Sequence, residues 1–228
     1  MAMTGRELVR RAIEFKGPER LPFIQHITPD VPDDVMESFE IDRAKGGWFL
    51  DHPALDDWGC VWERAQDSIT RDIGQVVYSP LEENWAAFDS YMPPDPGDDF
   101  YYERIPPLLE EAGERYVMLS SIMTLHERHR FLRGFENALM DYQLEPDKTH
   151  NLLDMILEFR VRQFQEINRR FGGRVDGLFL TEDWGTQEAP FVAIDVFEEF
   201  YRERYKVMAD AAHDNGLHTI LHSCGKVN

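Results

Sequence analysis

The sequence predicts an α/β protein whose strands form a parallel sheet. Three short apolar runs, at 116–121, 177–181 and 219–221, have the character of buried core strands. Segments with the apolar spacing of amphipathic helices separate these runs, and the connecting loops are short. Strands that alternate with helices in this way lie parallel and are joined by right-handed crossovers. The sequence therefore predicts either a β/α barrel or a doubly wound sheet.

The composition indicates one globular domain over residues 1–228, with 43% hydrophobic residues and a formal net charge of −19. So acidic a chain argues against a nucleic-acid partner and against binding to an anionic membrane surface. No apolar run has the length of a membrane span, and the first residues lack the apolar core of a signal peptide. Cys60 and Cys224 lie too far apart to suggest a disulfide framework, so we expect a cytoplasmic protein.

The first elements follow from local signals. Thr4 and Glu7 have the spacing of a capping box, and the helix that they begin ends before Gly17-Pro18. Residues 21–27 read as the first strand because apolar side chains recur there. The acidic, Pro-containing stretch 28–40 is expected to be a loop with one helical turn.

The next segments predict an arm and a connection. Residues 58–62 and 73–78 resemble two short strands, which we expect to form a hairpin arm over about 55–80, separate from the core sheet. The segment 92–107 holds five prolines and predicts a surface connection.

Three helices complete the pattern. One is expected over 126–142, and a long one begins at Asp147 and ends at Gly172-Gly173. A third is expected to be capped by Asp195 and to end at Asn215-Gly216.

The last strand ends in a His-x-Cys pair. Successive side chains of a strand alternate between its faces, so His222 and Cys224 point the same way. An imidazole and a thiolate on one face, at the end of a strand that gives way to Gly225, indicate a zinc site. The alternative is that Cys224 is simply a small packing residue.

A second candidate motif follows the strand at 177–181. Glu182 and Asp183 lie at its carboxyl end, and the carboxyl ends of parallel strands open on the same side of a sheet. We expect the two motifs to face a common cleft, where the carboxylates bind a metal, orient a ligand or act as acid and base. The alternative interpretation is that Glu182 and Asp183 are ordinary acidic residues of a loop, without a functional role. His26, at the end of the first predicted strand, shares this rim by topology.

A basic cluster begins the helix predicted at 126–142. It contains His126, Arg128, His129 and Arg130. A solvated helix face and a site for a carboxylated or phosphorylated ligand are equally good interpretations, and Glu127 within the cluster weakens the second.

Four motifs carry a resemblance to a known family. They are Arg20-Leu21-Pro22-Phe23, Asp57-Trp58-Gly59-Cys60-Val61-Trp62, Glu182-Asp183-Trp184-Gly185-Thr186-Gln187 and His222-Ser223-Cys224-Gly225. In these the chain resembles the uroporphyrinogen decarboxylase superfamily, and most of all its zinc- and cobalamin-dependent methyltransferase branch. The resemblance implies a (β/α)8 TIM-type barrel that is incomplete here, as a C-terminally truncated fragment lacking the last strand–helix units.

The resemblance also implies a mechanism. Zinc is held by His222, Cys224 and a third protein ligand beyond Asn228, with Glu182 and Asp183 as catalytic residues lining the site. A methyl group moves between a corrinoid, supplied by a partner protein, and a small-molecule thiol or methylated substrate. We expect Trp184, Gln187 and His26 to contact the substrate.

Two alternatives remain open. The first is a metal-free carboxy-lyase of tetrapyrrole metabolism like the superfamily's namesake. The absence of arginine from 23–30, where such decarboxylases carry arginines for the substrate carboxylates, argues against it. The second is a non-catalytic barrel that binds a ligand or a partner.

Overall fold

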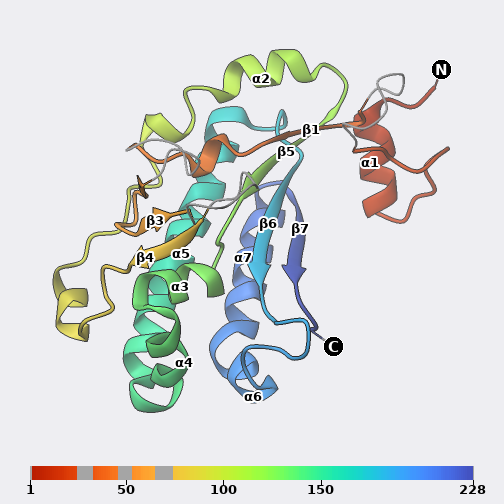
Figure 1. Cartoon of the computed structure of the whole chain (residues 1–228). Coiled ribbons are helices and arrows are strands. Elements are labelled where there is room, and N and C mark those ends of the chain that lie inside the picture. Colours follow the sequence, from red (N-terminus) through yellow and green to blue (C-terminus); the bar gives the residue numbers. More distant parts are fainter. Residues whose placement is uncertain (1, 25–32, 46–52, 65–73, 228) are drawn as a thin grey trace.

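The protein is built around a four-stranded parallel sheet, shown in Figure 1. The computed structural model describes residues 2–24, 33–45, 53–64 and 74–227. The strand order is β1-β5-β6-β7, and each neighbouring pair is parallel. The strands are β1 (Val35–Ser38), β5 (Tyr116–Ser121), β6 (Gly177–Asp183) and β7 (His218–Cys224). The predicted α/β class with a parallel sheet is confirmed, but within the described ranges this sheet is open and forms no closed barrel.

Helices cover one face of the sheet and form a hydrophobic core with it. The covering helices are α2 (Ile105–Ala112), α5 (Pro146–Phe171) and α7 (Glu203–Asp214). Alternate residues of β5 and β6 point toward them, because successive strand side chains point to opposite faces. The buried contacts join Val117, Leu119, Leu178 and Leu180 of the sheet to Leu109, Phe164, Ile167, Met208 and Ala212 of the helices.

Helix α1 (Gly5–Ile13) closes the amino-terminal ends of the strands. Val9 packs on Tyr116 and Met118 at the start of β5. Asp176, fully buried just before β6, is paired with Arg6 at 2.9 Å and with Arg10 at 2.8 Å. These contacts hold α1 at the end of the sheet opposite the carboxyl ends, where the candidate site lies.

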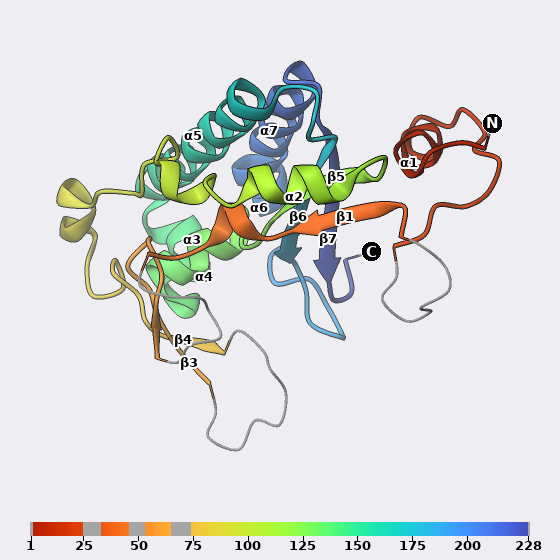
Figure 2. The same ribbon diagram turned by 90° about the horizontal axis from the view of Figure 1, so that it is seen from above.

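The predicted arm is present as a separate antiparallel sheet. It contains β2 (Ala54–Leu55), β3 (Val61–Glu63) and β4 (Gln75–Tyr78) in the order β2-β3-β4. Figure 2 shows β3 and β4 set apart from the parallel sheet. The hairpin prediction is confirmed, and β2 is a third strand that the sequence pattern did not reveal.

The predicted first strand at 21–27 is wrong over the part that the structure describes. Residues 21–24 form no strand, and 25–27 lie outside the described residues. The buried carboxylate of Asp34 instead pairs with Arg20 and accepts the backbone N–H of Phe23 at 2.7 Å, which ties this segment down outside the sheet. The first strand is β1, inside the stretch 28–40 that was expected to be a loop, and its backbone pairing with β5 stabilises it.

The helix expected over 126–142 is two helices, α3 (His126–Arg133) and α4 (Phe135–Leu144). The break is at Gly134, whose φ of +80° lies in the region that favours glycine. A Cβ there would come within 3.0 Å of the Glu82 side chain, so the chain turns at a position where Glu82 packs closely.

The segment 92–107 also differs from the expectation. The Pro-rich connection at 92–107 includes the start of α2, where Pro106 and Pro107 occupy the first turn, a position that proline tolerates. Short 3-10 turns, η2 (Trp85–Ser90) and η3 (Asp99–Tyr101), lie before it.

Asp195 does not cap its helix. The N-cap of α6 (Ile194–Phe197) is Ala193, and Asp195 lies in the first turn. The helix continues through a π-helical turn, η4 (Glu198–Arg202), into α7. No helix among the described residues is both long and apolar enough to cross a membrane.

Candidate metal centre

Three potential metal ligands meet where β6 and β7 end, close to the label C in Figure 1. The two strands pair so that Asp183 lies opposite Cys224 and Thr181 opposite His222. The Nε2 atom of His222 is 3.1 Å from the Sγ atom of Cys224. One ligand atom from each of Asp183, His222 and Cys224 lies within 4.8 Å of the others. His222 and Cys224 do share a face, as strand alternation requires, and both are exposed.

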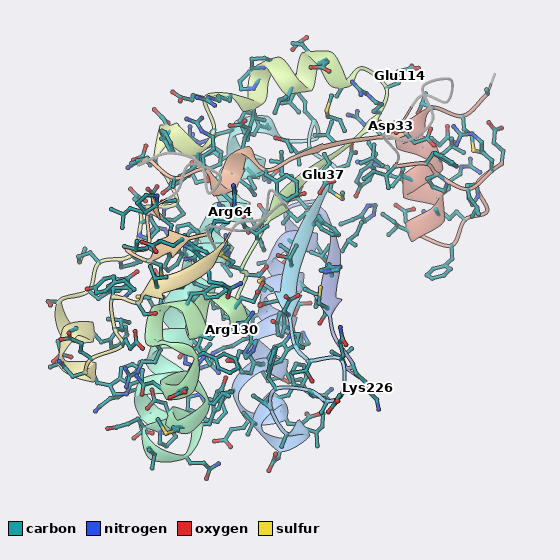
Figure 3. The ribbon with its side chains drawn as sticks, viewed as in Figure 1. Asp33, Glu37, Arg64, Glu114, Arg130 and Lys226 are labelled. Carbon is teal, nitrogen blue, oxygen red and sulfur yellow. The ribbon has the colours of Figure 1, made fainter. Side chains whose placement is uncertain are left out.

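The backbone fixes the position of this cluster. The Cys224 N–H donates to Oδ1 of Asp183 at 3.2 Å. Just beyond, the loop after β6 and the turn after β7 are in close contact. The N–H of Lys226 donates to the carbonyl of Thr186 at 2.8 Å, and a Cβ on Gly225 would lie 2.1 Å from the carbonyl oxygen of Gly185. Figure 3 labels Lys226 at this corner of the molecule.

The electrostatics of the cluster suit a cation. The pKa of the Cys224 thiol is raised, chiefly by its hydrogen bond with the Asp183 carboxyl group, with desolvation and the charge of Asp183 adding to the effect. Without a counter-charge the sulfur therefore holds its proton at neutral pH. A divalent cation between these atoms reverses this preference, because it stabilises thiolate and carboxylate together.

Glu182 lies on the opposite face of β6 and does not join the cluster. It is fully buried, and its carboxylate accepts the backbone N–H groups of Leu125, of His126 at 2.9 Å and of Glu127 at 2.8 Å. The hydroxyl of Tyr205 donates to the same carboxylate at 2.7 Å. Burial raises the pKa of Glu182, and these hydrogen bonds oppose the rise. Glu182 thus satisfies the amino-terminal N–H groups of α3, which otherwise have no partner in the helix.

The three residues expected to contact substrate have different surroundings. Trp184 is buried and stacks on the His126 ring at a centroid distance of 4.1 Å. Gln187 is exposed in the loop after β6. His26 lies outside the described residues, so its predicted place on the rim stays a prediction.

The four residues of the basic cluster in α3 have different surroundings in the structure. His126 and His129 are buried against the hydroxyl of Tyr201, and burial lowers the pKa of His129 to about 3. Arg128 pairs with Asp56 at 2.7 Å inside the protein. Only Arg130 of these four lines a sizeable cavity.

Glu127 stands out in the sequence only as an acidic residue within the basic cluster, and its buried place near Glu182 and Asp183 was not predicted. Burial, together with the charges of Glu182 and Asp183, raises its pKa to about 7, and its ion pair with Arg130 at 2.7 Å opposes the rise. The available signal was its place directly after the loop that follows a core strand.

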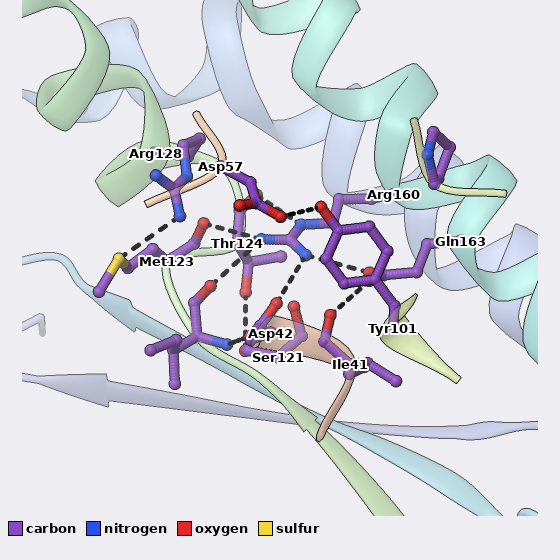
Figure 4. A network of polar contacts seen from close by, with 12 residues as sticks. Ile41, Asp42, Asp57, Tyr101, Ser121, Met123, Thr124, Arg128, Arg160 and Gln163 are labelled. Carbon is purple, nitrogen blue, oxygen red and sulfur yellow. Dashed lines mark hydrogen bonds and ion pairs between the residues drawn. The ribbon is translucent and has the colours of Figure 1, made fainter. Parts of the chain in front are cut away.

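A second polar network, drawn in Figure 4, fixes the turn that leads from β5 to α3. Arg160 of α5 is buried, and it donates to the carbonyl groups of Ile122, Met123 and Thr124 at 3.1 to 3.2 Å. Its Nη1 atom also donates to Gln163 at 3.0 Å. The network thus holds the turn at 122–124, and this turn positions α3 beside β6.

Comparisons with known proteins support the fold. No protein-family model and no curated protein matches the chain. A solved structure described as a methyltransferase from Methanosarcina mazei is similar, with a TM-score of 0.54 and 14% sequence identity. The similarity covers 99% of this chain and 57% of the other, so this chain spans little more than half of that protein. At this identity the likeness concerns the fold alone: this chain has the α/β arrangement found in part of that methyltransferase.

Proposed function

We propose that this protein is a zinc-dependent methyltransferase that moves a methyl group between a corrinoid, carried by a partner protein, and a small-molecule thiol. The observation that carries the proposal is the convergence of Asp183, His222 and Cys224 within 4.8 Å. The fold that this chain shares with part of a protein described as a methyltransferase is compatible with this reaction. We also propose that the parallel sheet is part of a β/α barrel, a fold in which chemistry takes place at the carboxyl ends of the strands.

The residues present fit zinc. Catalytic zinc sites use three protein ligands from nitrogen, sulfur and oxygen donors and leave a fourth position open. Two ligands at ordinary Zn–N and Zn–S distances and a tetrahedral angle are about 3.6 Å apart. The observed 3.1 Å between His222 Nε2 and Cys224 Sγ needs only a small side-chain adjustment to reach that value. Asp183 offers a third donor within this chain, and the ligand expected beyond Asn228 stays a prediction.

Each residue of the site has a definable role in the proposed reaction. Zinc, when bound, supplies a Lewis acid that makes a substrate thiol ionise at neutral pH. His222 and Cys224, exposed on the same face of β7, would hold the ion. Asp183 anchors the Cys224 backbone and balances the positive charge. Glu182 is a positioning residue, because it holds the amino end of α3 against β6 from the other face.

Zinc analysis of purified protein tests the proposal most directly. We expect about one zinc per chain after incubation with the metal and removal of the excess. Cys224→Ser and His222→Ala should lose most of this zinc. Cys60→Ala is the matched control, because Cys60 is the buried cysteine and lies outside the cluster.

Methyl transfer is measured separately, from methylcobalamin to added thiols, by the change in corrin absorbance. Transfer that requires zinc and fails in Cys224→Ser supports the proposal. Protein that stays zinc-free after incubation contradicts it and favours the metal-free carboxy-lyase.

A further inference from the structure

A cavity lies between the arm and helices α3 and α4. It has a volume of about 420 Å³, which is in the size range of small-molecule sites. We call it the arm cavity. Its apolar wall includes Val76 and Phe131, Phe135 and Phe191, and its polar wall includes Glu82 and Arg130. It does not share lining residues with the candidate metal centre, and the sequence pattern did not predict it.

Arg130 is the cationic group of this cavity. Its guanidinium carbon lies 5.0 Å from the ring centroid of Phe131, 5.4 Å from that of Phe191 and 5.8 Å from that of Phe135. The side chain is only 13% exposed. Three aromatic rings thus surround a largely desolvated positive charge at the cavity wall. Arg130 belongs to α3 and is labelled in Figure 3.

The hydrogen-bonding capacity of Arg130 is mostly unused. Its Nη2 atom donates to Glu127 at 2.7 Å. Its Nε atom is buried and has no partner among the described residues. A guanidinium has five N–H donors, and buried donors without an acceptor are costly. This pattern is typical of a site that is completed by a further acceptor, and a carboxylate matches a guanidinium with two parallel hydrogen bonds.

Arg130 is the basic group available to a ligand here, although the cavity wall also carries the negative charge of Glu82. The ring faces, which attract cations, are already occupied by Arg130 itself. Arg128, two residues earlier, is neutralised by Asp56 at 2.7 Å, and His126 and His129 are buried with lowered pKa values. Arg130 is therefore the residue of the basic cluster that can meet a ligand in this cavity.

We propose that the arm cavity binds a small ligand with a carboxylate on an apolar or aromatic body, the carboxylate pairing with Arg130 and the body packing on Phe131, Phe135 and Phe191. The proposal does not depend on zinc or on methyl transfer. Of the two interpretations of the basic cluster, a solvated helix face and a site for a carboxylated or phosphorylated ligand, it favours the ligand site and a carboxylated ligand.

Calorimetric titration with 3-phenylpropionate tests the proposal, with 3-phenylpropanol as the uncharged analogue. We expect saturable binding of the carboxylate and at least about tenfold weaker binding of the alcohol, the loss of one charge-assisted contact. Arg130→Gln should weaken carboxylate binding by a similar factor. Arg202→Gln is the matched control, because Arg202 is an exposed arginine outside the cavity and should leave the affinity unchanged.

Glu82→Gln keeps the proposal testable if Arg130→Gln does not fold. Removing a negative charge from the cavity wall should tighten carboxylate binding by about twofold or more. The proposal is overturned by any of three results: no saturable binding to the wild-type protein, equal binding of the acid and the alcohol, or unchanged or weaker binding to Glu82→Gln.

Discussion

Replacement of Glu182 by alanine should destabilise the protein far more than any change at its neighbour Asp183. The side chain of Glu182 is fully buried and accepts four hydrogen bonds, three from backbone N–H groups of residues 125–127 and one from the hydroxyl of Tyr205. The Ala variant leaves all four donors without this acceptor. Asp183 is partly exposed and accepts one backbone N–H, from Cys224 at 3.2 Å.

The magnitude follows from these contacts. A buried donor left without a partner costs about 1–3 kcal/mol, and the costs are not additive because water enters the space and the helix end relaxes. Removal of the carboxylate also relieves the desolvation that raises the pKa of Glu182. We expect a net loss of about 3–5 kcal/mol in the free energy of unfolding for Glu182→Ala. Glu182→Gln should lower the free energy of unfolding by about 2 kcal/mol, because the NH2 group of its amide cannot accept a hydrogen bond from the N–H donor that it faces. Asp183→Asn should lose under about 1 kcal/mol.

Urea unfolding followed by circular dichroism measures these values, and equal m-values are required for the comparison. Hydrogen exchange adds a local readout: the amides of Leu125, His126 and Glu127 should lose protection in both Glu182 variants. The reasoning fails if Glu182→Ala unfolds within about 1 kcal/mol of the wild-type protein. It also fails if Asp183→Asn costs as much.

Two other predictions concern the turn after β7 and the buried histidines. Gly225→Ala should cost about 2–4 kcal/mol in urea unfolding, whereas the control Gly173→Ala should cost about 1 kcal/mol. Both have positive φ, but only at Gly225 would the Cβ meet backbone, so equal losses would contradict the packing argument. His129 has a pKa of about 3 in the fold, below its unfolded value, so its contribution to stability is present above about pH 6.5 and is lost as the pH falls. Between pH 7.5 and 5.5 the wild-type protein should therefore lose about 1.4 kcal/mol more than His129→Phe. Parallel pH profiles of the two proteins would refute this.

Part of the candidate site could be predicted from the sequence because it depends on local geometry. His222 and Cys224 share a face since strand side chains alternate, whatever the rest of the fold does. The separation of Glu182 from Asp183 obeys the same rule. It was missed because the strand was expected to end at Thr181, whereas β6 continues to Asp183. Strand length here is set by backbone pairing with β7, which the acidic side chains do not reveal.

The elements that can be predicted from the amino-acid sequence are those with a strong side-chain pattern, namely β5, the long helix α5 and the apolar parts of β6 and β7. Burial selects apolar residues at fixed spacing there, so pattern and structure agree. Two features depend on contacts between distant segments. They are β1, which has four residues and pairs with β5, and the break at Gly134, where Glu82 packs against the turn. The same holds for Glu182 and Arg160, because a charged side chain can be buried here only where distant segments supply its partners.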